Sequence, residues 1–254
     1  MIISGENTVV TLKDSAGDGS YVTRGIIATV IDGATLNIES GYYESTGDNA
    51  FWAGRKNATG TINVGTAAGG PEIVAQEDCI AAGKDSTIVV NNGTFTSKDN
   101  AVLASNGSAG YEGAKITVND GYFFGHIETN GYTGCGVYFP NDGELTINGG
   151  KWNIDGVGVC ARAGKVNVKG GEFVSTVDTA GWVGDKKTQV PAYGVVFDGA
   201  AKYPGLAEGA QVNITGGTFT NTANADAAGV MVTQPDNGIT VGLTNTAGWR
   251  EPLL

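Results

Sequence analysis

Three acidic pairs of neighbouring residues stand at matching places in the sequence. They are Asp48-Asn49, Glu77-Asp78 and Asp99-Asn100, and each comes directly before a short apolar run. Stacked about 4.8 Å apart, their carboxylates would repel one another unless a cation or neighbouring amides compensated the charge. Oxygen ligands of this kind suit Ca²⁺, so Asp48, Asp78 and Asp99 form a candidate calcium site. The alternative is a ladder of Asn/Asp turns that bond their own backbone.

The other side chains that commonly do chemistry are scattered. The only histidine, His126, follows a glycine in an expected loop, and Arg162 stands at an expected, solvated turn. A glycosidase needs two carboxylates at a fixed separation. The expected strands contain no Asp-Asp pair, and the chain shows no nucleotide-binding motif, Ser/His/Asp set or zinc-ligand spacing. We therefore expect no enzyme activity and no cofactor other than the candidate Ca²⁺.

Aromatic and polar side chains gather in two long stretches between the apolar runs. The candidate binding residues in them are Trp182, Asp185, Lys186, Tyr193 and Tyr203. Loops on a rigid scaffold often carry binding residues, and aromatic rings beside amides and carboxylates could bind a sugar or a partner surface. Ordinary solvated loops with a few anchoring aromatics are the other interpretation.

The elements that must position these side chains recur along the chain. One run alternates apolar with polar residues and continues into a glycine and an aromatic, as in Leu145, Ile147, Gly150 and Trp152. Its copies begin at residues 10, 36, 62, 88, 116, 145, 166 and 212, so the first four are 26 residues apart. A constant unit with later insertions is typical of a repeat protein.

A second run alternates with the first. It starts with a small residue and continues with apolar ones, as in Gly158-Val159-Cys160-Ala161. Strands this short bury no face alone, so successive units must stack, with their strands parallel. The sequence predicts an all-β, right-handed, single-stranded parallel β-helix of about eight coils. We expect an N-terminal capping coil at 1–24, the β-helix at 25–243, and a C-terminal tail at 244–254 that caps the rod or docks onto another protein.

Period-two alternation assigns the faces of the strands. Leu145 and Ile147 face the core while Glu144 and Thr146 face outward, and the aromatic after each glycine fills the next corner. We expect a buried aromatic column, with a stack of sugar platforms as the other interpretation. The column comprises Tyr43, Phe95, Phe123, Trp152, Phe173 and Phe219.

The second run holds too many consecutive apolar residues for one core, so one of them must point outward in each copy. The expected outer column includes Ile27, Trp52, Leu103, Tyr138, Val196 and Met231. Contiguous exposed apolar patches mark contact sites. We expect this column to be a lateral subunit interface in a homotrimer of parallel rods. The alternative is that loop insertions cover it.

Composition excludes several classes of partner. The formal net charge of −11 disfavours nucleic acid and anionic membrane surfaces. No apolar stretch reaches the length of a membrane span, and the first residues do not form a signal peptide pattern. The three cysteines, Cys79, Cys135 and Cys160, are odd in number and lie in expected strands. We expect buried thiols in a protein that is assembled in a reducing compartment.

Over nearly the whole chain, the repeated segments resemble those of the pectate-lyase-like right-handed parallel β-helix family. Examples are Val212-Asn-Ile-Thr-Gly-Gly-Thr-Phe219 and Ile88-Val-Val-Asn-Asn-Gly-Thr-Phe95. The segments 156–164 and 193–199 also resemble β-helical proteins encoded by phages and prophages of gut-type bacteria. That resemblance implies a virion surface component such as a head fibre, decoration protein or tail spike. No catalytic motif of the family maps onto a residue of this chain.

Three functional expectations follow. The first is a non-enzymatic phage virion surface protein, a head fibre or decoration protein, that binds other capsid proteins and presents its flank to host or mucosal glycans. The second is a polysaccharide-degrading tail spike or lyase, and the third is a bacterial surface adhesin. For the first, we expect assembly in the host cytoplasm and location on the virion surface, without secretion through a signal peptide.

Overall fold

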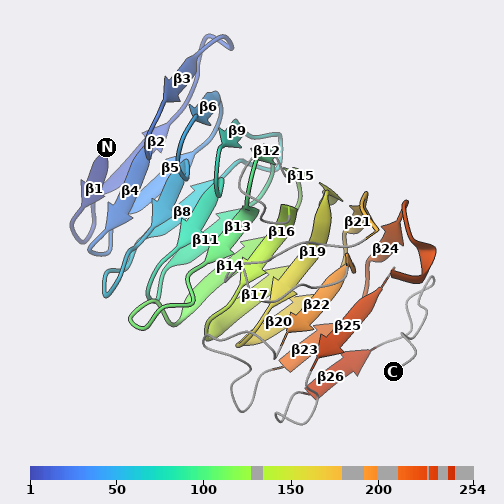
Figure 1. The fold of residues 1–254 in the computed structure, drawn as a ribbon. Helices are drawn as coiled ribbons and strands as arrows, with labels where there is room; N and C mark the ends of the chain where they lie inside the picture. The colour runs from blue at the N-terminus through green and yellow to red at the C-terminus, as the bar shows by residue number, and fades with distance from the viewer. Residues whose placement is uncertain (127–133, 179–191, 199–210, 228, 234–239, 244–254) are drawn as a thin grey trace.

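The computed structural model is a stack of short strands wound into a parallel β-helix (Figure 1). It describes residues 1–126, 134–178, 192–198, 211–227, 229–233 and 240–243. Over these ranges there is no α-helix, and the one helical turn is the 3-10 segment η1 at Ala225–Ala227. The prediction of an all-β parallel β-helix is confirmed. None of the helical structure in the described ranges has the length and apolar character needed to cross a membrane.

The strands form three parallel sheets, named A, B and C in the order in which the chain visits them. Sheet A contains β1 (Ile2–Ser4), β4 (Ala28–Ile31), β7 (Phe51–Ala53), β10 (Ile80–Ala82), β13 (Ala101–Ser105), β16 (Gly134–Phe139), β19 (Gly156–Ala161), β22 (Val195–Asp198) and β25 (Val230–Thr233). Sheet B contains β2 (Val9–Leu12), β5 (Thr35–Ile38), β8 (Thr61–Val64), β11 (Thr87–Val90), β14 (Ala114–Val118), β17 (Gly143–Ile147), β20 (Lys165–Val168), β23 (Gln211–Ile214) and β26 (Thr240–Leu243). Sheet C contains β3 (Ser20–Thr23), β6 (Tyr42–Ser45), β9 (Glu72–Ala75), β12 (Thr94–Ser97), β15 (Tyr122–Gly125), β18 (Lys151–Ile154), β21 (Glu172–Ser175) and β24 (Thr218–Asn221).

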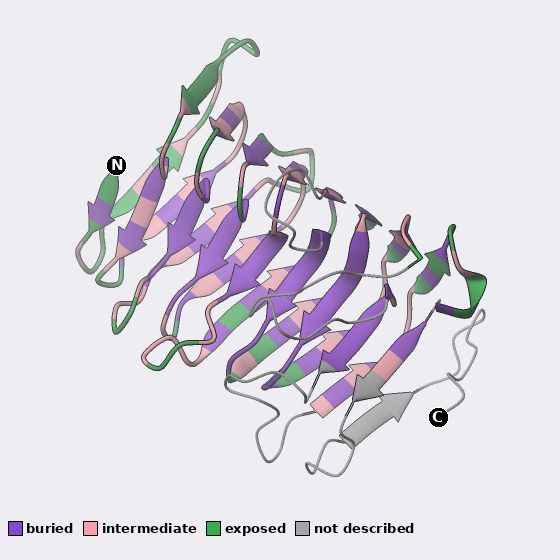
Figure 2. Ribbon diagram, viewed as in Figure 1, coloured by how far each residue is buried: buried purple, intermediate pink, exposed green. Residues whose placement is uncertain are grey.

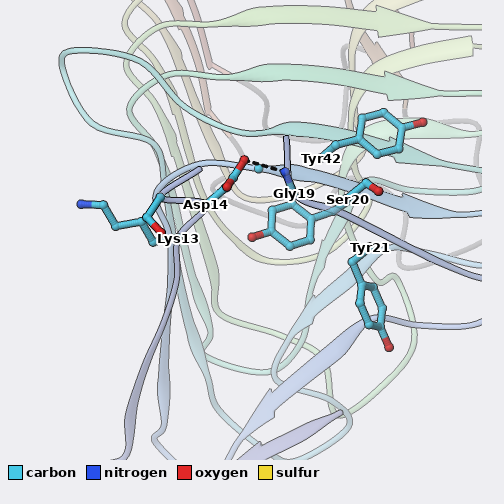
Figure 3. A pocket seen from close by; sticks show the side chains of 9 residues that line it. Lys13, Asp14, Gly19, Ser20, Tyr21 and Tyr42 are labelled. Atoms are coloured by element: carbon cyan, nitrogen blue, oxygen red, sulfur yellow. Dashed lines mark hydrogen bonds between the residues drawn. The ribbon is translucent and has the colours of Figure 1, made fainter. Parts of the chain in front are cut away.

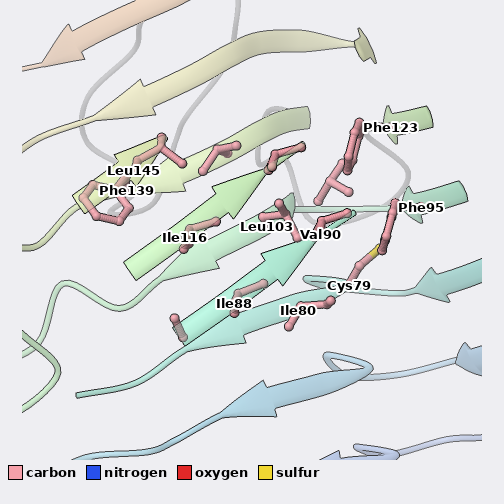
Figure 4. Close-up of a cluster of buried hydrophobic side chains, with 14 of the residues drawn as sticks. Cys79, Ile80, Ile88, Val90, Phe95, Leu103, Ile116, Phe123, Phe139 and Leu145 are labelled. Atoms are coloured by element: carbon pink, nitrogen blue, oxygen red, sulfur yellow. The ribbon is translucent and has the colours of Figure 1, made fainter. Parts of the chain in front are cut away.

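Pairing register is kept from coil to coil, so equivalent residues form columns along the rod. In sheet B, Leu145 pairs with Ile116 on one side and with Val166 on the other. All three are buried whereas Glu144 is exposed, which confirms the predicted assignment of inward and outward residues. Figure 4 shows such side chains from neighbouring coils meeting in a common interior. Each coil thereby shields the apolar interior of the coil before it, and this burial is the main stabilising term.

The aromatic column of sheet C is buried and stacked. The ring centroids of Phe123 and Trp152 lie 3.8 Å apart, those of Trp152 and Phe173 lie 5.4 Å apart, and the ring planes of both pairs are nearly parallel. Phe95 and Phe219 continue the stack on either side. Parallel, in-register strands place equivalent side chains about 4.8 Å apart, which suits ring stacking. The interpretation as a core column is confirmed, and the rings are too deeply buried to serve as sugar platforms.

Glycine is required where sheet A passes the largest ring of this column. Gly136 in β16 lies against Gly158 in β19 and against Trp152. A Cβ atom on Gly136 would lie 2.3 Å from the carbonyl oxygen of Gly158 and 2.9 Å from Cε3 of Trp152. These positions therefore admit no side chain, since real Cβ atoms do not approach backbone so closely.

A second apolar cluster lies on the outer face of sheet A. Trp52, Tyr138, Val196 and Met231 occupy its outer register column, as predicted from the sequence. Ile27 and Leu103, however, were placed wrongly, because both side chains are buried in the interior core. Their outer positions are taken by Thr29, which pairs with Trp52, and by Ala104, which pairs with Tyr138.

The N-terminal end of the rod is an open coil. β1, β2 and β3 are the terminal strands of sheets A, B and C, and each pairs in register with one neighbouring strand. These three strands lie in the segment 1–24 that was predicted to cap the rod. Much of this coil is exposed, in contrast to the buried strands of the middle coils (Figure 2). The predicted C-terminal tail, 244–254, lies outside the described residues.

Candidate functional site

The acidic pairs lie in successive coils, directly before β7, β10 and β13 of sheet A. Their hydrogen bonds run between coils. Nδ2 of Asn49 donates to Oδ2 of Asp78 at 3.2 Å, and the backbone amide of Asp78 donates to Oδ1 of Asn49 at 3.3 Å. On the other side, the backbone amide of Ala101 donates to Oδ1 of Asp78 at 3.2 Å. Asp78 thus ties its own coil to the coils before and after it.

Asp78 is buried in this ladder, and burial raises the pKa of its carboxyl to about 7. The hydrogen bond from Ala101 opposes this rise, while the charge of Glu77 adds to it. The pKa of the Glu77 carboxyl is also raised, first by burial and then by the charges of Asp48 and Asp99. The corner therefore holds acids whose ionisation the fold disfavours.

We call these three acidic pairs the acidic corner. Only the bond from Asn49 to Asp48 is a turn that bonds its own backbone, the alternative to a calcium site, whereas the bonds of Asp78 and Asp99 run to neighbouring coils. Both carboxylate oxygens of Asp78 accept N–H groups, and Oδ1 of Asp48 accepts the backbone amide of Asn49 at 2.7 Å. Oδ2 of Asp99 accepts Nε2 of Gln76 at 2.5 Å. Calcium needs about six to eight oxygen ligands. Among the described residues, no group of three or more His, Cys, Asp and Glu side chains could hold a metal ion.

A second polar constellation stacks across the ends of β15, β18 and β21. Nδ1 of His126 lies 2.9 Å from Oδ2 of Asp155, and the hydroxyl of Thr176 donates to Oδ1 of the same carboxylate. The carboxylate fixes the orientation of the imidazole ring, and both side chains are partly exposed. Sequence reasoning missed this constellation because its members are distant in the chain and meet only when coils stack.

Four of the five residues predicted to bind a glycan or a partner surface lie outside the described residues. They are Trp182, Asp185, Lys186 and Tyr203. Tyr193 is described: it is half-buried and packs against the outer apolar cluster of sheet A. Its carbonyl oxygen accepts the amide of Gly158 at 3.2 Å. Tyr193 therefore anchors its segment to the sheet, and the binding site itself stays a prediction.

The outer apolar column of sheet A is covered within a single chain. The guanidinium of Arg55 lies 4.2 Å from the ring centroid of Trp52, and the ring of Tyr111 packs at 6.3 Å. Arg162, expected at a solvated turn, is instead fully buried, and its Nη1 donates to the hydroxyl of Tyr138 at 2.7 Å. These contacts agree with covering segments, the alternative to a lateral interface. The homotrimer was predicted because the column was expected to be exposed. The column is covered, and the homotrimer stays a prediction.

An open pocket of about 260 Å³ lies where the chain passes from sheet B to sheet C in the first two coils (Figure 3). The carboxylate of Asp14 accepts three backbone amides of segment 16–19, each at 2.9 Å. These bonds, that of Gly19 foremost, lower the pKa of the Asp14 carboxyl. The rings of Tyr21 and Tyr42 point away from each other (Figure 3). Tyr21 and Tyr42 therefore form no pair of facing aromatic surfaces that would hold a sugar.

The described polar groups thus mostly hold coils and turns together, and the His126–Asp155 pair is the arrangement best suited to proton transfer. Comparison of the chain with protein-family models, with curated proteins and with solved structures finds no match.

Proposed function

We propose that this chain is a non-enzymatic surface protein of a bacteriophage virion, a head fibre or decoration protein. The observation that carries the proposal is the use of polar side chains to join coils. Asp78 links three coils, and just beyond the ends of three sheet B strands the amide of Asn119 bonds both Asn91 and Asn148, at 2.9 and 2.8 Å. Continuous ladders of this kind suit a stiff rod, because each bond supports its neighbours.

The virion setting is supported by the resemblance of segments 156–164 and 193–199 to β-helical proteins of phages and prophages. We propose that other capsid proteins hold the rod and that its flank binds host or mucosal glycans. The net charge of −11 is consistent with a partner that is neither nucleic acid nor an anionic membrane. The predicted glycan residues, Trp182 and Tyr203 among them, lie outside the described residues.

A polysaccharide-degrading tail spike is the second candidate, and the His126–Asp155 pair favours it. An imidazole held at Nδ1 by a carboxylate leaves Nε2 available to accept or donate a proton. Thr176 holds the carboxylate in turn, so the pair has the orienting third group that many proton-transferring sites have.

Two experiments separate these functions. The purified chain is incubated with a panel of acidic and neutral polysaccharides, and new reducing ends and unsaturated products are measured for wild type and for His126→Asn. Our proposal expects no cleavage by either protein. Specific cleavage that the substitution abolishes would establish the tail spike instead. Detection of the chain in purified phage particles supports the virion role, whereas detection in the bacterial cell envelope supports an adhesin.

A further inference from the structure

Exposed apolar side chains gather at the N-terminal end of the rod. Of the six large hydrophobic residues that are exposed in the described structure, five belong to the first coil: Met1, Ile2, Val9, Tyr21 and Val22. Val9 is 61% exposed and Val22 is 55% exposed. Four of the five lie on β1, β2 and β3, whose outer edges have no strand neighbour among the described residues. Apolar side chains on unpaired strand edges favour association.

We propose that this end pairs with the same end of a second copy of the chain, through a two-fold axis perpendicular to the rod. A flipped copy presents its own three strand edges, and each runs antiparallel to the edge that it faces. Flipping reverses the order of the sheets around the rod, so one of the three edges faces its own equivalent and the other two face each other. We assign β1 to face β1 and β2 to face β3, because the side chains of β2 and β3 match. This dimer goes beyond the virion role and does not depend on it.

The side chains of β2 and β3 fit this pairing. Val10 and Tyr21 belong to inward columns, since their partners in the next coil, Leu36 and Tyr43, are buried. An antiparallel register that sets Val10 opposite Tyr21 of the second copy joins the two interiors. In that register the outward Val9 lies opposite Val22 of the second copy. The exposed apolar residues of the two strands would therefore cover one another.

Charges at the strand ends favour the antiparallel arrangement. β2 follows Glu6 and precedes Lys13, and β3 follows Asp18 and precedes Arg24, all four exposed. Antiparallel pairing brings Lys13 to Asp18 and Arg24 to Glu6 of the second copy, whereas parallel pairing would bring like charges together. Lys13 already makes a 3.0 Å ion pair with Glu39. Exposed pairs add little affinity, so their role here is to select orientation.

Sedimentation velocity of the purified chain tests the proposal. We expect a dimer at micromolar concentration. Val9→Glu or Val22→Lys alone should raise the dissociation constant at least about 100-fold, because each places an unpaired charge against an apolar side chain. The protein with both substitutions should regain the dimer, since opposite charges then face each other across the interface. Tyr122→Glu, at an exposed apolar residue on the flank, should leave the dimer unchanged.

A wild-type monomer, or an oligomer that Val9→Glu and Val22→Lys leave intact, overturns the proposal; an intact trimer would point to a lateral interface. If circular dichroism shows that the charge variants do not fold, disulfide formation between introduced cysteines tests the proposal instead. Mixed Val9→Cys and Val22→Cys chains should form a disulfide-linked dimer under mild oxidation, because the native thiols are buried. A mixture of Val9→Cys and Tyr122→Cys chains is the control. If the first mixture forms no more disulfide-linked dimer than this control, the proposed pairing of β2 with β3 is contradicted.

Discussion

Asp78→Asn tests whether the acidic corner makes stability depend on pH. Burial raises the pKa of the Asp78 carboxyl from its ordinary 3.8 to about 7. Because the folded-state pKa lies above the unfolded one, the folded chain binds this proton more tightly than the unfolded chain does. The stabilising contribution is therefore complete below the ordinary pKa and is lost as pH rises through about 7. The substitution puts a neutral amide of similar shape in place of the carboxyl.

The size of the effect follows from the two pKa values. A difference of about three pKa units corresponds to about 4 kcal/mol in total, of which about 2.5 kcal/mol falls between about pH 5 and pH 8. The amide cannot accept N–H groups from both Asn49 and Ala101, so the variant should lose about 1 kcal/mol relative to the protonated acid. Between pH 5 and pH 8 the variant should consequently gain about 2.5 kcal/mol on wild type.

Urea unfolding followed by circular dichroism, at several pH values in this window, measures the difference. Comparing the two proteins at each pH cancels the titrations that do not depend on Asp78. The titration of Glu77 is coupled to that of Asp78 and stays within the measured difference. Glu44 and Glu112 have pKa values that hydrogen bonds lower, so their contribution is complete above the ordinary 4.5 and stays constant here. Asp120→Asn is the matched control, since the exposed Asp120 carboxylate accepts the amide of Gly121 at 2.8 Å.

A constant difference between Asp78→Asn and wild type from pH 5 to pH 8 would refute this reasoning. Asp78 would then ionise without penalty, as it would if a bound cation neutralised it. Repeating the unfolding with excess CaCl₂ identifies that case. Our account expects no effect of calcium. A gain in wild-type stability that Asp78→Asn abolishes would reinstate Asp48, Asp78 and Asp99 as calcium ligands.

Three further substitutions test the stacking of coils, each by urea unfolding at pH 7. Trp152→Ala removes the centre of the aromatic stack and should cost about 3–5 kcal/mol, whereas Tyr122→Ala on the exposed flank should cost less than about 0.5 kcal/mol. Gly136→Ala should cost at least about 2 kcal/mol, whereas Gly25→Ala, where a Cβ meets no atom within 4 Å, should be tolerated. Asn119→Ala breaks the amide ladder at the ends of the sheet B strands and should cost about 1–2 kcal/mol. Equal costs for Trp152→Ala and Tyr122→Ala, or a neutral Gly136→Ala, would contradict the packing described.

Most of the fold could be predicted from the repeat period and from the alternation of inward and outward residues along each strand. Leu145 and Trp152 could be placed in the core because a strand alternates its faces and every coil repeats the alternation. The errors arose where the chain turns a corner. The sequence pattern aligned Ala101 with Gly136 and so placed Leu103, two residues later, on the outer face. In the structure Val102 aligns with Gly136, and the outward residue is therefore Ala104.

The candidate sites were less predictable because they depend on contacts between coils. The position of Asp78 beside Asn49 and Ala101 follows from stacking, yet its burial depends on how tightly the corner closes. The His126–Asp155 pair spans 29 residues and leaves no local pattern in the sequence. The cover over Trp52, which includes Tyr111, comes from an insertion whose path no periodicity specifies.

The claim on which the account depends is that this β-helix is a structural part of a phage particle and not an enzyme or a cell-surface adhesin. Quantitative mass spectrometry of gradient-purified particles from the strain that carries the gene tests it most directly. The account predicts this chain at a copy number comparable to that of the other minor capsid proteins, with antibody labelling of intact particles. Particles that lack the chain, together with its recovery in the cell envelope or the culture medium, would contradict the account.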